Sequence, residues 1–283
     1  MGSATSRFHS VRLPKDRRVT VGIGILGLFT LMALFAPWLT PYGPHQVSGQ
    51  PWSPPSLQHW MGTDELGDDI MSQIIYGARV SLTVGFSVAL AATLIGSLIG
   101  LMSGFYRGVT DEVLMRLTDV VLILPSLPLA IILAAYLGPS VLTIIEVLTV
   151  TGWPLVARVV RSQTLSLRER PFVDAERVIG AGNARIMFRV IIPNLLSLIA
   201  ANAVLAITAA VVGEAGLDFI GLGNPSVVSW GTMLYWSQNL NAILRGAWWW
   251  ILAPGLCIAF VGLGAVLVSV GIENLFNPRL RGR

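Results

Sequence analysis

The segment 172–194 holds the side chains best suited to meet a partner in the aqueous phase. It combines charged residues such as Asp174, Glu176 and Arg177 with two glycines, and it lies between two long apolar stretches. Charged loops of this kind do not drive insertion into a bilayer, so we expect this one to bind something outside it. The alternative is an amphipathic interfacial loop that only connects two spans.

The first part of this segment has the signals of a short helix. Pro171 suits a first helical position, because its fixed φ is helical and its missing N–H would have no partner there. Phe172, Ala175 and Ile179 recur at i, i+3 and i+7, which places them on one helical face. The charged residues point elsewhere on this helix.

The second part predicts a turn followed by another helix. Gly180 and Gly182 are expected to end the first helix, since glycine tolerates the left-handed backbone of a helix end. Asn183 can cap a second helix, and Pro193 is expected to mark the turn into the next span. Together, these residues predict a helix–turn–helix elbow at a membrane surface.

Two acidic residues lie inside apolar stretches. Glu146 would cost about 2.5–3.5 kcal/mol near the bilayer centre, so we expect it to face a cavity, a partner subunit or a hydrogen-bond donor. It is a candidate for a solute pathway, chiefly for cationic cargo, and a hydrogen bond at a subunit interface is the alternative. Glu214, near the outer end of a later span, is expected to have a structural or gating role.

Common catalytic motifs are absent from the sequence. Lys15 is the single lysine and follows Pro14, so the chain has no Gly-Lys-Ser/Thr phosphate loop. His9, His45 and His59 are scattered and form no metal-ligand pair, and no Gly-x-Ser-x-Gly elbow occurs. We therefore expect no catalytic residue, no bound metal and no cofactor in this chain. It is not expected to be an enzyme.

Composition predicts an integral membrane protein. Apolar residues make up 54% of the 283 residues and charged residues only 12%. The first apolar stretch is long enough to be a retained helix instead of a signal peptide. With about 20 residues needed per span, we predict an all-α fold of six transmembrane helices. They are expected within Val19–Thr40, Val80–Tyr106, Val120–Ile145, about Pro139–Ala157, Ile191–Gly213 and Gly246–Ile272.

The basic residues orient these spans. With a cytoplasmic N-terminus, 17 of the 19 Lys and Arg lie in inner segments, and only Arg79 and Arg245 lie outside. Both termini are therefore predicted to be cytoplasmic. The long outer loop, roughly Pro41–Ala78, contains four acidic residues and no Lys or Arg. Topology explains the net charge of +4, so nucleic-acid binding is not expected.

Other notable residues have packing explanations. Glycines at every fourth position from Gly96 to Gly104 predict close contact with a neighbouring helix. Pro125 and Pro128 are expected to kink a span. Three consecutive tryptophans, 248–250, suggest an interfacial belt at the outer start of the last span, with contact to a binding protein as the alternative.

The spacing within 172–194 resembles the EAA loop of binding-protein-dependent ABC importer permeases. That pattern is Glu-Ala-Ala, three residues, Gly, nine residues, then Ile-x-Leu-Pro. Asp174 shortens the usual glutamate, and Glu176 replaces a small residue. The positions of the pattern are occupied in order by Asp174, Ala175, Glu176, Gly180, Val190, Ile192 and Pro193.

Four further blocks are similar to the C-type subunit of the dipeptide/oligopeptide/nickel subfamily of these permeases. They are Gly62–Leu82, Asp111–Ala130, Gly152–Val173 and the stretch beginning EAGLDFIGLG at Glu214. Asp68 stands where the subfamily usually has arginine.

This resemblance implies one half of a translocation pathway, with the type I importer fold and no catalysis of its own. Such a permease pairs with a related permease, with two cytoplasmic ATPase subunits that bind ATP and Mg²⁺, and with an extracytoplasmic solute-binding protein. It would lie in the inner (cytoplasmic) membrane of a prokaryote, with lipid around it. The residues that would couple it to an ATPase subunit are Arg170, Phe172, Asp174, Ala175, Glu176, Gly180 and Pro193.

The implied organisation has three parts. Residues 1–78 form a cytoplasmic tail, the first span and the outer loop, residues 79–275 the permease core with its EAA loop at 168–194, and residues 276–283 a second tail. The implied cargo is a di- or oligopeptide, with nickel chelates, glutathione and opines as alternatives. A self-sufficient channel or secondary carrier is the other functional class. It would need polar residues in several spans, and these spans are nearly bare of charge.

Overall fold

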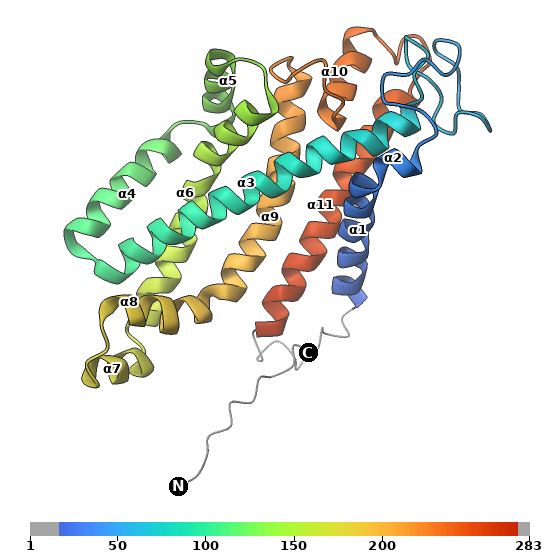
Figure 1. The fold of residues 1–283 in the computed structure, drawn as a ribbon. Coiled ribbons are helices and arrows are strands. Elements are labelled where there is room, and N and C mark those ends of the chain that lie inside the picture. Colours follow the sequence, from blue (N-terminus) through green and yellow to red (C-terminus); the bar gives the residue numbers. More distant parts are fainter. Residues whose placement is uncertain (1–16, 277–283) are drawn as a thin grey trace.

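A computed structural model describes residues 17–276, and these residues form a bundle of helices (Figure 1). Residues 1–16 of the predicted N-terminal part and residues 277–283 of the predicted tail 276–283 lie outside the described residues. The elements are α1 (Arg17–Leu34), α2 (Ala36–Leu39), α3 (Ile70–Tyr106), α4 (Gly108–Ile123), α5 (Ser126–Leu137), α6 (Val141–Arg168), α7 (Pro171–Val178), α8 (Asn183–Arg185), the π-helix η1 (Ile186–Ile191), α9 (Ile192–Phe219), α10 (Trp230–Asn239) and α11 (Trp249–Phe276).

Five helices in the described part are long and apolar enough to cross a membrane: α1, α3, α6, the continuous helix from α8 to α9, and α11. A sixth span is present if α4 and α5 count as one, although they are bent by 85°. The all-helical membrane fold predicted from composition is therefore confirmed.

The predicted span Val120–Ile145 is wrong. It crosses the end of α4, all of α5 and the start of α6. Pro125 disfavours a helical residue before it, and Leu124 is accordingly extended with φ −76° and ψ 130°. Gly138, with φ 89°, then ends α5. The kink expected at Pro125 is a complete break, whereas Pro128 lies inside the first turn of α5.

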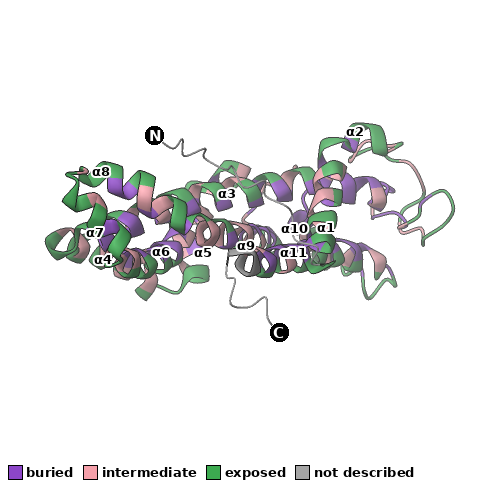
Figure 2. Ribbon diagram, turned by 90° about the horizontal axis from the view of Figure 1, so that it is seen from below, coloured by how far each residue is buried: buried purple, intermediate pink, exposed green. Residues whose placement is uncertain are grey.

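The long helix α3 crosses in front of α6 and α9 in Figure 1 and packs mainly against these two helices, while α1 lies along α11. The loop 40–69 and α10 lie at one end of α3, and α7 and α8 lie at the other. Exposed residues cover the outer faces of the helices (Figure 2). Many of them are large and apolar, for example Leu28, Leu90 and Ile132, as expected for side chains that face lipid.

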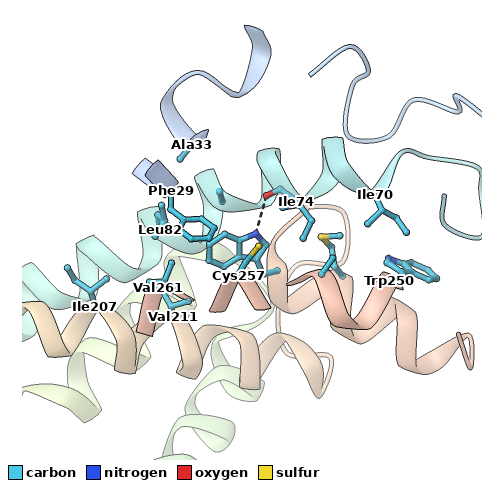
Figure 3. Packing of buried hydrophobic residues seen from close by; sticks show 14 of the residues in the cluster. Phe29, Ala33, Ile70, Ile74, Leu82, Ile207, Val211, Trp250, Cys257 and Val261 are labelled. Atoms are coloured by element: carbon cyan, nitrogen blue, oxygen red, sulfur yellow. Dashed lines mark hydrogen bonds between the residues drawn. The ribbon is translucent and has the colours of Figure 1, made fainter. Parts of the chain in front are cut away.

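Trp230 belongs to the apolar cluster at which α1, α3 and α10 meet. Figure 3 shows Phe29 of α1 and Ile74 of α3 in the same cluster. The side chain of Trp230 is fully buried, and its Nε1–H donates to the Ile74 carbonyl at 3.0 Å. The ring of Phe29 meets it edge-on, with centroids 5.5 Å apart. The bond joins α10 to α3, and the ring contact adds α1 to the same core.

The glycine stripe of α3 is a packing surface within this chain, as predicted. A Cβ on Gly100 would lie 2.4 Å from the Ala157 carbonyl of α6. Equivalent atoms on Gly96 and Gly104 would lie 2.6 and 2.7 Å from atoms of Trp153 and Thr164. The stripe therefore lets α3 and α6 approach closely.

Only one of the three consecutive tryptophans has the exposure expected of an interfacial belt. Trp248 is exposed, whereas Trp250 is buried and packs edge-on against Trp52 at 5.6 Å. Trp249 is half-buried beside Gly62. The prediction of a belt is therefore wrong for Trp250, because the loop 40–69 folds over it.

Candidate functional site

The short helix α7 forms as its sequence predicts. Arg170 is its N-cap residue with extended backbone, and Pro171 takes the first helical position. The helix ends in a Schellman motif, in which the Gly180 N–H donates to the Arg177 carbonyl at 3.0 Å and the Ala181 N–H to the Glu176 carbonyl at 2.9 Å. Gly180 has φ +80°, which confirms the predicted bend at this residue.

Helix α7 is held to the bundle by one buried side chain. Val173 is fully buried and belongs to an apolar cluster formed by α3, α6, α7, η1 and α9. Ala181 packs against the same cluster from the turn. The other members are Leu101, Phe105, Val156, Val160, Ile186, Met187, Ile191 and Leu195.

The remaining apolar residues of α7 are turned outward. Phe172 is 42% exposed, and Ala175 is also exposed. Val178 and Ile179, at the end of the helix, are 87% and 71% exposed. The residues predicted to share an apolar face therefore remain free of the bundle, and α7 presents an apolar surface outside the spans.

Ion pairs flank this surface. Arg177 Nη1 lies 2.9 Å from Asp174 Oδ1 on α7 itself. Arg185 Nε of α8 lies 3.5 Å from Glu176 Oε2 across the turn. Glu176, which departs from the EAA pattern, therefore connects the two arms of the elbow.

The second arm differs from the prediction. Gly182, not Asn183, is the N-cap residue of α8, and Asn183 is its first helical residue. Pro193 marks no turn, because α8, η1 and α9 form one continuous helix, 183–219, that passes through it. The π-helix η1, which ends two residues before Pro193, accommodates its missing N–H, and the Asn194 side chain donates to the Val190 carbonyl at 2.7 Å. The direction of the chain changes at Gly180–Gly182 instead.

A second set of contacts ties the elbow to the corner between α3 and α4. Arg107, at that corner, pairs with Glu169 just before α7. The guanidinium of Arg168 lies over the Phe105 ring, 5.8 Å from its centroid. Sequence reasoning missed these contacts, because the partners in the ion pair are 62 residues apart.

Helix α4 is bound to α6 by two further ion pairs. Arg161 donates from Nε and Nη2 to the two carboxylate oxygens of Asp111, each at 2.6 Å. Arg158 Nη2 donates to Asp119 at 2.6 Å. This bidentate arrangement fixes the orientation of α4 on α6.

Glu146 lies on α6 and is exposed in the single chain, between Leu142 and Val150, which lie one turn away on either side and are also exposed. Glu214 has the opposite environment. It is fully buried and accepts a hydrogen bond from Ser81 Oγ of α3 at 3.2 Å.

Asp218, one turn after Glu214, was not predicted as a site residue. It is 4% exposed and accepts from Ser229 Oγ at 2.5 Å, while the Trp230 N–H donates to Ser81 Oγ at 3.2 Å. The buried network thus joins α3, α9 and the start of α10. The i, i+4 spacing of the two acids was the available signal.

An apolar cavity of about 360 Å³ lies between α3, α5, α6 and α9. Its wall includes the polar side chains of Ser126, Thr151 and Asn202. Neither Glu146 nor Glu214 is among its lining residues. The pathway candidate Glu146 and the structural or gating candidate Glu214 are therefore not part of this cavity.

Comparison with known proteins gives two family matches. Residues 96–282 match the family described as "Binding-protein-dependent transport system inner membrane component". Residues 9–55 match the family described as "N-terminal TM domain of oligopeptide transport permease C".

Individual relatives are similar over nearly the whole chain. The dipeptide transport system permease protein DppC of Bacillus subtilis (strain 168) is 37% identical, covering 95% of this chain and 84% of its own length. A probable peptide ABC transporter permease of Sinorhizobium fredii (strain NBRC 101917 / NGR234) is 39% identical, covering 100% and 97%. The di/tripeptide permease DppC of Pseudomonas aeruginosa (strain UCBPP-PA14) is 35% identical, covering 92% and 88%.

Proposed function

Because this chain belongs to the family of binding-protein-dependent ABC importer permeases, in its dipeptide and oligopeptide subfamily, we propose that it forms half of a translocation pathway for short peptides. It is a multi-pass membrane permease of a bacterial transporter. Its membrane would be the inner one, and its other half would be a related permease subunit. An extracytoplasmic binding protein would deliver the solute.

The observation that carries the coupling part of the proposal is the outward apolar surface of α7. A short helix outside the spans keeps Phe172, Val178 and Ile179 exposed, although its neighbour Val173 is completely buried. Exposed apolar side chains bordered by charges are typical of a protein contact. We assign this surface to one of two cytoplasmic ATPase subunits. ATP and Mg²⁺ would be bound by those subunits and not by this chain.

The contacts around α7 give this surface a route to the spans. Val173 holds α7 against α3, α6 and η1, and the pair Arg107–Glu169 adds the corner between α3 and α4. A nucleotide can shift the permease between two states only if the ATPase contacts α7 differently in each state. Movement of α7 would then displace several spans together, as in a rigid-body transition.

The position of Glu146 supports the proposal that another part of the transporter covers one face of α6. A carboxylate in a span is costly in lipid, and this one is exposed in the single chain. Its neighbours Leu142 and Val150 are exposed on the same side. We infer that the related permease subunit or the solute pathway covers this face.

The cargo is inferred from the relatives, whose printed names include dipeptide, di/tripeptide and oligopeptide transport. A peptide is therefore proposed ahead of a nickel chelate, glutathione or an opine. The solute-binding protein would determine most of the specificity for particular peptides.

Reconstitution tests the proposed function directly. The chain is co-expressed with the permease, ATPase and binding-protein genes of its transporter and placed in proteoliposomes, and uptake of a labelled dipeptide is measured. Uptake that requires ATP and all subunits is expected. If the chain purifies alone and conducts the dipeptide without nucleotide, it is a self-sufficient channel or carrier, and the proposal fails.

A further inference from the structure

A second pocket lies at the end of the molecule opposite α7. It has a volume of about 230 Å³ and is enclosed by the loop 40–69, the start of α3, the loop before α10, α10 itself and the start of α11. The carboxylates of Asp64, Glu65 and Asp68 line it, together with the rings of Trp236 and Trp250. The other lining residues are His45, Leu66, Gln73, Pro225, Val227, Val228, Thr232 and Met233.

One of the three carboxylates is committed to the fold. Asp64 Oδ1 accepts from the backbone N–H groups of Leu66 and Asp68, each at 2.9 Å. Its Oδ2 accepts from Gln73 Nε2 at 2.6 Å. Asp64 therefore organises the wall of the pocket and has its oxygens occupied.

The other two carboxylates keep unused acceptors. Asp68 is only 2% exposed, yet its Oδ1 has no hydrogen-bond partner among residues 17–276. Glu65 Oε2 is likewise buried and unpaired in the described chain. Trp250 Nε1, a donor on the same wall, is also buried without a partner among the described residues. A buried polar atom without a partner is destabilising, so the two carboxylate oxygens indicate a missing donor.

The charge of the pocket is also unbalanced. None of the described residues that line it is lysine or arginine, and His45 is the single cationic candidate in its wall. Burial raises the pKa of Glu65 to about 7, helped by the negative charges of Asp64 and Asp68. Burial likewise raises the pKa of Asp68, while His45 lowers it. These acids would be stabilised by a cation placed between them.

We propose that this pocket binds the guanidinium or ammonium group of a basic side chain on a protein that docks at this end of the molecule. Asp68 and Glu65 accept its hydrogen bonds, and the indole rings of Trp236 and Trp250 provide apolar and π surface beside it. Arginine fits best, because its planar group can bond two carboxylates and stack on a ring.

The size of the pocket favours a side chain over a whole solute molecule. Sites for drug-sized ligands are roughly 300–1,000 Å³, and this one is about 230 Å³. A metal ion is not favoured, since the described residues contain no group of three or more His, Cys, Asp or Glu arranged to hold one. The identity of the docking protein rests on the proposed function, under which it is the extracytoplasmic solute-binding protein.

The test uses blocked amino acids with the full chain in lipid nanodiscs, at low ionic strength because screening weakens the contact. N-acetyl-arginine amide presents the guanidinium alone, and N-acetyl-citrulline amide has nearly the same shape without the charge. Binding is measured by saturation-transfer NMR. The arginine compound is expected to bind, and the citrulline compound at least about tenfold more weakly, since a hydrogen bond to a charged group contributes about that factor.

Variants identify the carboxylates. Asp68→Asn and Glu65→Gln should each weaken binding of the arginine compound by about tenfold, because each replaces a charged acceptor with a neutral one. Glu65 is only half-buried, so its variant tests the pocket even if Asp68→Asn does not fold. Glu112→Gln removes the same charge from an exposed site on α4 and should leave binding unchanged.

Three outcomes would overturn the proposal. The first is equal binding of the arginine and citrulline compounds. The second is unchanged affinity in a folded Glu65→Gln variant. The third is binding of glycylglycine, which has a free amino end, without binding of the arginine compound, because the pocket would then take a solute.

These measurements need neither ATP nor partner subunits. If ATP-driven uptake fails, the assignment of the docking protein is contradicted, but the proposal that the pocket binds a cationic group is not. If the arginine compound does not bind in nanodiscs while uptake is normal, only the proposal for the pocket is contradicted.

Discussion

Glu176 of α7 and Arg185 of α8 face each other across the turn at Gly180–Gly182, with Arg185 Nε 3.5 Å from Glu176 Oε2. The EAA pattern usually has a small residue at the position of Glu176. The longer side chain of Glu176 reaches Arg185, and the ion pair between them joins the two arms of the elbow. The Glu176 side chain is 27% exposed, so part of it remains accessible to a partner.

The substitution Glu176→Ala should have only a mild effect on the stability of the elbow and on ATPase binding. The lost ion pair is partly exposed and contributes about 0.2–1 kcal/mol, so the elbow keeps its fold. ATPase binding should persist, since the variant restores the usual pattern. Co-purification of the ATPase subunits measures it, and Arg185→Gln, which breaks the same pair from the other side, is the matched variant. Loss of the complex in Glu176→Ala but not in Arg185→Gln would show that Glu176 itself contacts the ATPase.

Gly180→Val should uncouple transport while leaving membrane insertion intact. The residue has φ +80°, a conformation that costs a β-branched side chain about 1–3 kcal/mol, although a Cβ there would meet no atom within 4 Å. Gly182→Ala is the control, because Gly182 has φ −68° and similar open space. ATP-driven dipeptide uptake in proteoliposomes is the measurement. Normal uptake with Gly180→Val would contradict a coupling role for the bend.

Two neighbouring substitutions on α7 should have different effects. Val173→Ala removes buried methyl groups and should destabilise the elbow by about 1–3 kcal/mol, seen as faster proteolysis near residue 180. Ile179→Asp changes a side chain that is 71% exposed, so the fold should survive and ATPase binding should weaken. Pull-down of the ATPase subunits separates the two effects. Undiminished binding by Ile179→Asp would exclude the outer surface of α7 as the docking site.

Gly100→Ala should loosen the contact between α3 and α6. Its new Cβ would lie 2.4 Å from the Ala157 carbonyl oxygen and 2.9 Å from the Arg161 backbone nitrogen. The backbone must therefore move, which should lower the free energy of unfolding by about 1–3 kcal/mol. Gly27→Ala in α1 is the control, since no atom lies within 4 Å of its added Cβ. Thermal unfolding in detergent compares them. Equal melting temperatures would mean that the two helices are not held at this distance.

The loop 40–69 should become less stable as pH rises from 4.5 to about 7. Burial raises the pKa of Glu65 from its ordinary 4.5 to about 7, so across this window the folded loop binds a proton that the unfolded loop has released. Asp64, Asp68 and His45 face the same pocket. Hydrogen exchange of the loop, corrected for intrinsic rates, should show falling protection over this range. Glu65→Gln should remove that part of the slope, and an unchanged slope would count against burial of this carboxyl.

Much of the fold followed from local signals. Composition predicted helices in a membrane, and Pro171 and Gly180 defined the start and end of α7 because each acts through its own backbone geometry. Hydropathy did not separate α5 from α4, because the apolar run continues through Leu124 and Pro125, whereas Gly138 is a turn signal in the sequence and does end α5. Pro193 was predicted to mark a turn, but the helix continues through it because a π-helix accommodates its missing N–H.

The site was less predictable than the fold. The residues of the EAA pattern are close in sequence, so their spacing was sufficient to locate α7. Asp68 could be noted only as a departure, because the pocket that it lines is formed by segments far apart in sequence, including α10 and the start of α11. The pairs Arg107–Glu169 and Arg161–Asp111 join segments 62 and 50 residues apart, and no local pattern specifies them.

Helix α3 runs unbroken for 37 residues, which corresponds to about 55 Å. Gln73 near one end touches the acidic pocket, and Phe105 near the other end lies under Arg168 beside the elbow. A single stiff rod therefore connects the two faces of the molecule. A tilt of the end beside α7 would move the end beside the acidic pocket as well, so occupancy of the pocket and engagement of α7 should influence each other's affinity reciprocally.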